Sequence, residues 1–372
     1  MSSLLPGIYS PTNWTHSETL DNLVAKTSSL AQAALQIVQS AAGGLQYCTS
    51  AMEQYALGLG HAYTDHAGAW DWLQDALASQ TEQGNIPNMH HPQASTPPFH
   101  SILAWYWWKK NPEAARIEAC YETLLKTHAY WYEQRDPREL GLPCIHFAEE
   151  SLWPECLQAI YGAGGFQVQD PGFLALLCRA NECLADLGEA LGKDLSALLQ
   201  WQELTVFGLN EDLWDDRTNT YRPYDVVQAK RLPGLYLSNY LPMWAGVPDQ
   251  EQAERLGSSL VKSFFREEYW ALPTQILEEK TAETETKLQV SPLLNRLMYA
   301  GLIRYGFVEN ARYLLKKTAQ MVGSYGFYPA YQALMHPYDN IGIGSGNDAG
   351  TAAVVLDLSN GLLEKRSFEQ HW

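Results

Sequence analysis

Basic side chains are scarce in this sequence relative to acidic ones. The 372 residues include 25 Lys and Arg against 42 Asp and Glu, which gives a formal net charge of −17. A surface of this sign repels phosphate backbones and anionic lipid headgroups over distances that salt does not screen. We therefore expect no nucleic-acid partner and no membrane partner.

Long apolar runs and targeting signals are missing as well. No stretch of about 18 apolar residues occurs, which a membrane-spanning helix would need. The start, MSSLLPGIYSPTNW, has no basic region followed by an apolar one. These absences predict a soluble protein located in the cytoplasm.

The signatures of metal and cofactor sites are absent too. The 6 cysteines form no C-x-x-C pair, and the histidines show neither H-x-x-x-H nor H-E-x-x-H spacing. The glycine-rich GIGSG at 342–346 follows no predicted strand, so it does not match a dinucleotide-binding fingerprint. We predict reduced, mostly buried thiols, no metal and no cofactor.

Strand-like alternation is rare, and helical periodicity dominates instead. Residues of one helix face recur at three- and four-residue steps in two stripes: Leu20, Leu23, Thr27, Leu30, Ala34, Val38 and Ala253, Leu256, Leu260, Phe264. Further helices are predicted near 47–62, 66–82, 98–109, 112–134, 171–191, 193–207, 289–305, 308–322 and 347–364. Helices joined by alternately short and long loops favour hairpins packed side by side.

We therefore predict an all-α protein with a single domain over residues 1–372, including an N-terminal extension over 1–16. If six hairpins close into a ring, an (α/α)6 toroid, the inner helices surround a central pit. The long loops on one rim would then carry the chemistry. The longest turn-rich segments are 83–97, 141–170, 217–237 and 326–349.

Aromatic residues are plentiful, at 12% of the chain with 13 Trp and 21 Tyr. Such a surplus often lines carbohydrate sites, because the apolar faces of sugars stack on aromatic rings. The alternative is that a large helical core simply holds many aromatics.

Several motifs follow one another in a fixed order along the predicted loops. They are SQTEQGNIPN at 79–88 with STPP at 95–98, LWDDRTNTY at 213–221, PMWAG at 242–246, and GFY at 326–328 with the apolar run AAVVLDL at 352–358. In this order they resemble the α/α-toroid glycosidases that include processing α-glucosidase I, trehalase-like enzymes and mannosylglycerate hydrolases. The resemblance implies the toroid fold and a glycoside substrate.

The resemblance also implies inverting hydrolysis, which needs a carboxylic acid and a carboxylate base roughly 6.5–9.5 Å apart. The family's acid lies in a segment like H-P-W-E-S-G-x-D-x-S, which aligns with HFAEESLWPE at 146–155. A gapless reading puts Glu149 on the family's Glu and Trp153 on its catalytic Asp, whereas a two-residue slip supplies Glu155 as the acid. The family's base, a Glu in G-F-Y-E-Y-Y, is replaced here by Pro329.

Two further positions depart from the family. A Trp-Asp pair that contacts the sugar appears here as Tyr47-Cys48, and the family's Tyr-Trp-Arg-Gly-Pro segment is replaced by KLQVSP at 287–292. Because scaffold motifs match while these positions differ, we expect a pit adapted to something other than the family's usual glycoside.

Candidate catalytic residues follow from these segments. Glu149, Glu150 or Glu155 would be the acid, because a carboxyl pressed against Trp153 has its pKa raised; the alternative is a solvated helix start. The partner would be His336, Asp339 or Asp348, although Asp348 is also placed to cap the last helix. The candidate substrate-binding residues are Tyr47, Asn88, Trp153, Tyr161, Tyr240, Tyr328 and Tyr331. The alternative for the last four tyrosines is a place in the core, and for Asn88 a turn.

The first hypothesis is a divergent glycosidase-like enzyme that acts on a small glycoside or polyhydroxylated metabolite in an aromatic pit by carboxylate acid–base chemistry. The second is a non-hydrolytic enzyme on the same toroid, a lyase, isomerase or cyclase, since the water-activating base is missing. The third is a catalytically inactive relative that binds a sugar or a protein partner. The sequence leaves the substrate, the reaction type and the oligomeric state open.

Overall fold

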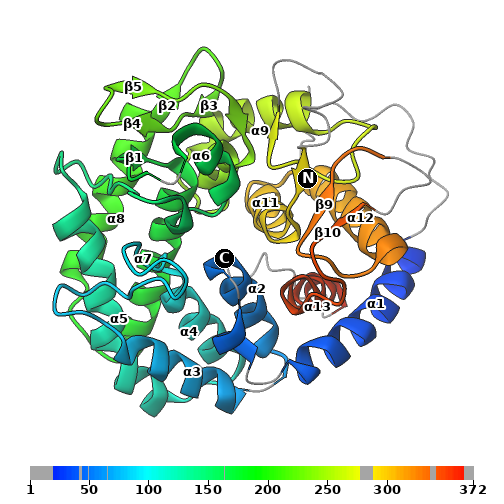
Figure 1. The fold of residues 1–372 in the computed structure, drawn as a ribbon, viewed down its shortest axis with the longest axis horizontal. Coiled ribbons are helices and arrows are strands. Elements are labelled where there is room, and N and C mark those ends of the chain that lie inside the picture. The colour runs from blue at the N-terminus through cyan, green and yellow to red at the C-terminus, as the bar shows by residue number, and fades with distance from the viewer. Residues whose placement is uncertain are drawn as a thin grey trace, which may run out of the picture.

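The computed structural model describes residues 20–41, 44–48, 50–64, 66–162, 164–276, 288–335 and 341–363. Helices make up most of these ranges and are arranged in two concentric layers (Figure 1). The predicted N-terminal extension over 1–16 lies outside the described residues, and the single-domain organisation stays a prediction.

Six elements form the inner layer and close into a ring. In chain order they are α2 (Ala51–His61), α4 (Phe99–Lys110), α7 (Pro171–Ala190), the 3-10 helix η4 (Leu237–Met243), α11 (Pro292–Arg304) and α13 (Ala349–Leu363). Each element packs against the next one, and α13 returns to pack against α2. The ring is seen end-on in Figure 1.

The outer layer alternates with the inner one along the chain. Its helices are α1 (Leu20–Ser40), α3 (His66–Ala78), α5 (Ala114–Arg135), α8 (Ser196–Gly208), α9 (Gln250–Phe264) and α12 (Val308–Tyr325). Helix α1 packs on α13, α3 and α5 pack on α4, α8 packs on α7, α9 packs on η4, and α12 packs on α11. This is the architecture of the predicted all-α (α/α)6 toroid.

The connections differ in length according to their direction. Those leading from an inner element to the next outer helix are short and cover 62–65, 111–113, 191–195, 244–249 and 305–307. Those leading from an outer helix back to an inner element include the long segments 79–98, 136–170, 214–236, 265–291 and 326–348. Because the hairpins alternate in direction, the long segments gather where the inner elements begin. The predicted alternation of short and long loops is confirmed.

Local signals explain where several helices begin. Asp249 caps α9, accepting a hydrogen bond from the backbone N of Gln252 at 2.8 Å. Helices α7 and α11 begin with Pro171 and Pro292, whose fixed φ suits the first helical position. The predicted stripe of Ala253, Leu256, Leu260 and Phe264 is fully buried, so α9 packs through the face that the periodicity indicated.

Short antiparallel strands organise the long segments. They are β1 (Val168–Gln169), β2 (Trp214–Asp215), β3 (Thr220–Tyr221), β4 (Tyr224–Asp225), β5 (Lys230–Arg231), β6 (Leu235–Tyr236), β7 (Gln275–Ile276), β8 (Gln289–Val290), β9 (Ala330–Gln332) and β10 (Gly342–Ile343). They pair in the orders β1-β4-β5, β10-β9-β8, β2-β3 and β6-β7. Strand β1, for example, pairs Val168 with Asp225 and so joins two segments that are far apart in the sequence.

The core holds much of the aromatic surplus. Trp70, Trp107, Trp131 and Trp244 are among its largest fully buried side chains, and all six cysteines are buried thiols. No helix of the described part of the chain is long and apolar enough to cross a bilayer.

A buried ion pair joins the inner helices where the ring closes. Arg296 on α11 donates from Nε to Asp357 Oδ2 on α13 at 2.9 Å, and both side chains are at most 2% exposed. Asp357 Oδ1 accepts further hydrogen bonds from the hydroxyls of Tyr63, at 2.8 Å, and Tyr106 on α4. Together these contacts connect α4, α11 and α13 with the end of α2.

Candidate active site

A cavity of about 750 Å³ opens where several inner helices begin. Its wall is built from the first turns of α2, α11 and α13, from the start of the short helix α6 (Pro154–Tyr161), and from the segments that precede them. We call it the central cavity. Helix N-termini direct unpaired N–H groups and a partial positive charge at such a site, which suits oxygen-bearing ligands and developing negative charge.

Among the described residues, three carboxylates line the central cavity. Glu53 lies in the first turn of α2, Glu155 in the first turn of α6, and Asp348 directly before α13. In Figure 1, α6 lies across the middle of the ring from α2 and α13. The cavity therefore receives carboxyl groups from more than one side.

Asp348 is held by the helix that it precedes. Its Oδ2 accepts a hydrogen bond from the backbone N of Thr351 at 2.6 Å, so it caps α13 as one reading of the sequence expected. Burial raises the pKa of Asp348, the hydrogen bonds from Thr351 oppose that shift, and the nearby charge of Glu53 adds to it. The carboxyl thus keeps its proton to a higher pH than an exposed aspartate does.

Cys48 lies close to the same two carboxylates. Burial, with added repulsion from Glu53 and Asp348, raises the pKa of its thiol to about 12. Cys48 stands where the resemblance places a sugar-contacting Asp, so a neutral thiol replaces a negative charge beside the cavity.

A chain of hydrogen bonds fixes the start of α6. The backbone N of Trp153 donates to Ser151 Oγ at 3.1 Å, and Ser151 Oγ donates to Asp170 Oδ2 at 3.3 Å. Asp170 in turn accepts from the backbone N of Gly172 at 3.1 Å and caps α7. Burial raises the pKa of Asp170 to about 8. Glu155, two residues beyond Trp153, is thereby tied to the inner ring.

Gly172 lets the ring of Trp153 pack directly on α7. A Cβ at this position would lie 2.2 Å from the indole, closer than real Cβ atoms approach. The indole is 3% exposed and forms part of the cavity wall. Among the described lining residues Trp153 is the aromatic one, and the remaining wall is aliphatic or polar. Its polar groups, suited to hydrogen-bonding a hydroxylated ligand, are Ser50, Thr274, Gln289, Ser291, Ser345, Asn347 and Thr351.

The family model described as "Mannosylglycerate hydrolase MGH1-like glycoside hydrolase domain" matches residues 54–346. The chain belongs to this glycoside hydrolase family. The match runs from within α2 to just before α13, so it includes Glu155 and Pro329 of the cavity wall but neither Glu53 nor Asp348.

Curated relatives agree with this assignment. A mannosylglycerate hydrolase of Rubrobacter radiotolerans is 29% identical over 198 residues, which cover 52% of this chain and 44% of that protein. The chain thus spans less than half the length of this relative. A mannosylglycerate hydrolase of Thermus thermophilus is 27% identical over 323 residues, which cover 71% of this chain and 75% of the relative.

Solved structures show the same fold. The crystal structure of a mannosylglycerate hydrolase from Thermus thermophilus in complex with Tris superposes with a TM-score of 0.74 at 22% identity, covering 88% of this chain and 99% of that one. The predicted (α/α)6 toroid is confirmed.

Pro329 stands where the sequence resemblance predicts the base of the glycoside hydrolases. It lines the central cavity together with Ala330 of β9. A proline ring offers no lone pair to a proton or a water. Asp348 lines the same cavity and carries the carboxylate that the base position lacks.

The two adjacent glutamates of the family's acid segment lie in different surroundings. Glu150 is 0% exposed and pairs with Arg135. Its carboxylate also accepts from the backbone N of Ser95 at 2.8 Å and of His146 at 2.6 Å. Glu149 accepts from Gln158 at 3.2 Å and lines a separate cavity of about 320 Å³. The structure therefore brings Glu155 and Asp348 to the central cavity, but neither Glu149 nor Glu150.

Most of the predicted substrate-binding residues bond to the protein's own groups, away from the lining of the central cavity. Asn88 Oδ1 accepts from the backbone N atoms of His90, at 3.0 Å, and His91, at 3.2 Å, which is the role of a turn residue. The tyrosines bond through their hydroxyls or pack on neighbouring rings. Tyr161 donates to Asp225 at 2.6 Å, Tyr240 bonds Ser259 at 3.1 Å, Tyr331 donates to Gly326 O at 2.6 Å, and Tyr328 packs on Tyr331.

Three of the predicted positions lie outside what the structure describes, namely His336, Asp339 and the side chain of Tyr47. Glu53 was missed, although the sequence holds a signal for it. Ser50 and Glu53 have the S-x-x-E spacing of a helix start, and Ser50 Oγ accepts from the backbone N of Glu53 at 3.1 Å. Within the described ranges, no group of three or more His, Cys, Asp and Glu side chains is arranged to hold a metal ion.

Proposed function

We propose that this chain hydrolyses a small glycoside in the central cavity, with Glu155 as general acid and Asp348 as general base. The observation that carries the proposal is the presence of Glu155 and Asp348 on the wall of one cavity in a glycoside hydrolase family member. The names of its relatives, mannosylglycerate hydrolases, favour a glycoside of comparable size.

The reaction follows the inverting scheme. Asp348 takes a proton from a water, whose oxygen forms a bond to the anomeric carbon. The glycosidic C–O bond breaks with its electron pair going to the leaving oxygen, which receives the proton of Glu155. The raised pKa of Asp348 makes its carboxylate a stronger base once it is ionised.

Turnover of mannosylglycerate and trehalose by the purified protein tests the proposal, with products identified by mass spectrometry. In hydrolysis, the masses of the two products together exceed the mass of the substrate by one water. Glu155→Gln should lower kcat by about a thousandfold, because general acid–base steps contribute roughly 10²–10⁴. Glu251→Gln is the matched control, since Glu251 lies in the first turn of the outer helix α9. Equal activity of the two variants would exclude Glu155 as the acid.

A second candidate function rests on Pro329. Its place at the cavity wall favours a protein that binds a sugar without hydrolysing it, or one that rearranges it without an attacking water. Tight sugar binding with unchanged ligand mass over hours would support binding alone. A product of equal mass would indicate an isomerase or cyclase, and a product lighter by one water a lyase.

A further inference from the structure

A second large cavity lies beside the outer helix α9. Its volume is about 720 Å³, and α9, the β2–β3 turn and the strands β6 and β7 border it. None of its lining residues lines the central cavity. We call it the α9 cavity. Its size is that of a small-molecule site.

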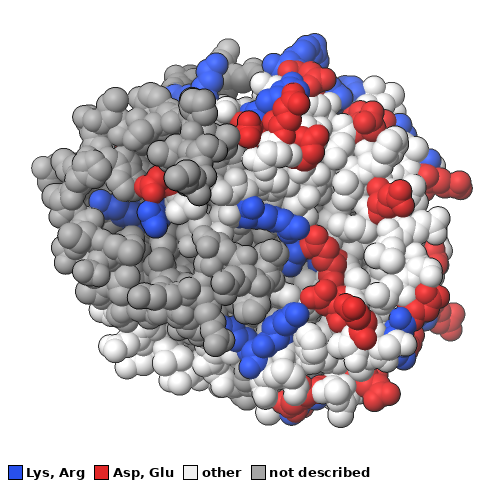
Figure 2. Space-filling view, turned by 180° about the vertical axis from the view of Figure 1, so that it is seen from behind, with Lys and Arg blue, Asp and Glu red and all other residues white. Residues whose placement is uncertain are grey.

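The α9 cavity is basic in a protein that is strongly acidic. Among the described residues, its lining includes Arg217, Arg222, Arg255 and Lys262 and one acidic residue, Glu254, whereas the whole chain has a net charge of −17. On the face shown in Figure 2, many of the basic side chains lie beside acidic ones, and in the α9 cavity Arg222 and Lys262 have no ion pair within the described ranges. A concentration of positive charge in such a chain favours an anionic occupant.

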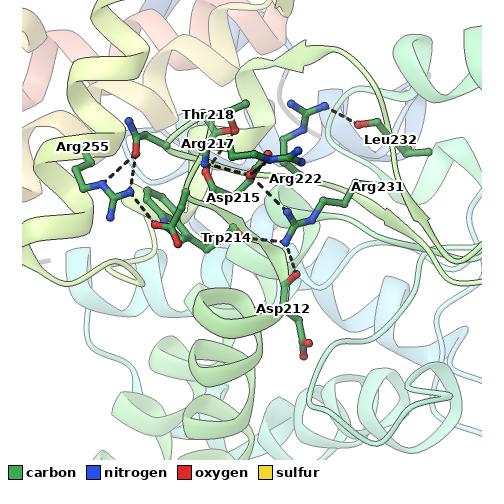
Figure 3. Close-up of polar contacts among 12 residues, drawn as sticks. Asp212, Trp214, Asp215, Arg217, Thr218, Arg222, Arg231, Leu232 and Arg255 are labelled. Atoms are coloured by element: carbon green, nitrogen blue, oxygen red, sulfur yellow. Dashed lines mark hydrogen bonds and ion pairs between the residues drawn. The ribbon is translucent and has the colours of Figure 1, made fainter.

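Neighbouring acids hold two of the guanidinium groups in place. Arg255 donates from Nη2 to Asp216 Oδ1 at 2.7 Å and to Asn219 Oδ1 at 2.8 Å, and it lies over the ring of Trp214 (Figure 3). Arg217 Nε lies 3.4 Å from Asp215 Oδ1, although its side chain is 86% exposed. These contacts restrict the conformations of both arginine side chains. They do not use all the N–H groups of either guanidinium, so some remain available to a ligand.

The other two cations have fewer partners. Arg222 donates from Nη2 to Leu232 O at 2.8 Å, as Figure 3 shows, while its buried Nε has no acceptor in the described part of the structure. A buried N–H without an acceptor is costly unless a ligand or water supplies one. Lys262 is exposed in the last turn of α9.

Hydroxyl groups complete the wall. Thr218, Ser258, Ser259 and Ser263 line the α9 cavity beside the cations. Ser259 Oγ donates to Thr218 O at 3.1 Å and bonds the hydroxyl of Tyr240 in η4 at 3.1 Å. A site that combines several cations with hydroxyls matches the oxygens of a doubly charged phosphate better than those of a single carboxylate.

We infer that the α9 cavity binds a small organic phosphate. The ligand would place its phosphate between Arg217, Arg222 and Lys262 and its hydroxylated part against the serines. The inference rests on the lining of the α9 cavity and is independent of the reaction proposed for the central cavity.

Isothermal titration with glycerol 3-phosphate at constant ionic strength tests this site, and glycerol is the neutral control ligand. We expect saturable 1:1 binding of glycerol 3-phosphate and none of glycerol. The double variant Arg217→Gln/Lys262→Gln should weaken the affinity at least tenfold. Arg312→Gln/Lys126→Gln is the matched control, because it removes the same charges from exposed positions on α12 and α5. It should bind like the wild type.

Two outcomes would overturn the inference. The first is no binding to the wild type, or the same affinity in both double variants. The second is loss of binding in Asp348→Asn, which would assign the phosphate to the central cavity.

Discussion

Two groups of carboxylates in this ring differ in what faces them. Glu150 and Asp357 are 0% exposed, and each is bonded to an arginine. Glu155 and Asp348 line the central cavity, and neither makes an ion pair within the described ranges. The first group has its lone pairs occupied by fixed donors, while the second presents oxygen atoms to a cavity.

The two groups of carboxylates are therefore expected to differ in their effects on the stability of the fold and on the proposed reaction. A carboxylate bonded to arginine and to other fixed donors has little room to contact a ligand, and its loss leaves a buried cation without a counter-charge. A carboxyl beside a cavity costs the fold little and can exchange a proton with a ligand. Under the proposed function, the same residue type would serve both purposes within a few residues of sequence, with Glu150 in the first role and Glu155 in the second.

The largest effect on stability is expected from Glu150→Gln. The variant keeps the shape but removes the charge that faces Arg135, so about 3–5 kcal/mol of unfolding free energy should be lost. Urea denaturation measures this loss. Glu149→Gln, at the adjacent half-buried position, should change the free energy by less than about 0.5 kcal/mol. Similar losses in both variants would contradict the division between the two groups.

The pH dependence of activity should reveal Asp348. Because burial and Glu53 raise its pKa, the acidic limb of kcat/KM should lie above the ordinary range of an aspartate. Glu53→Gln removes the repulsion and should move that limb to lower pH. Asp348→Asn should abolish the limb, whereas Asp249→Asn, a matched helix cap on α9, should leave it in place. If the acidic limb of kcat/KM does not move in Glu53→Gln, Glu53 does not influence the pKa of Asp348.

The same shift has a consequence for stability, with a definite sign. The pKa of Asp348 is higher in the folded than in the unfolded protein, so its contribution is fully present at low pH, where both states are protonated. That contribution is lost as the pH rises through the unfolded and then the folded pKa. The unfolding free energy of the wild type should therefore fall across this window more steeply than that of Asp348→Asn.

The helices were predictable because a buried face repeats along the sequence. The stripe from Ala253 to Phe264 is one example, and the position of the long loops followed from the alternation of loop lengths. The roles of Glu149 and Glu150 were not predictable in this way. They are neighbours in the 3-10 helix η2 (Ala148–Glu150), where successive side chains point in different directions, and only the position of Arg135 decides which one is buried.

The tyrosines teach a similar lesson. Tyr240 and Tyr331 lie in or beside segments that border the ring, yet both are 0% exposed and bond to the protein's own groups. The position of an aromatic residue in the sequence predicts that it lies near a site, but it does not predict whether the side chain faces the site or the core. Glu53 shows the opposite case, because its helix-start spacing was present in the sequence and places it at an inner helix N-terminus.

The smallest effect is expected from Ser151→Ala, which removes the link between the start of α6 and the buried Asp170. Ser151 Oγ donates to the buried Asp170 and accepts from the backbone N of Trp153, so the variant should lose about 1 kcal/mol of unfolding free energy. The hydrogen bond from Ser151 lowers the pKa of Asp170, so its loss should raise that pKa above about 8 and keep the carboxyl neutral. Ser79→Ala, an exposed position where Oγ donates to Ala76 O at 2.6 Å, is the control.

Ser151→Ala also tests whether the hydrogen bonds of Ser151 position Glu155 for the proposed proton transfer. If Ser151 positions Glu155, kcat should fall several-fold while KM changes little, because the acid is displaced from the leaving oxygen and the sugar contacts are kept. If Ser151 only stabilises the fold, kcat measured well below the melting temperature should match that of Ser79→Ala. The first result would show that a residue behind the cavity wall, as well as the carboxylates that line it, affects the reaction. The second would show that Ser151 contributes to stability alone.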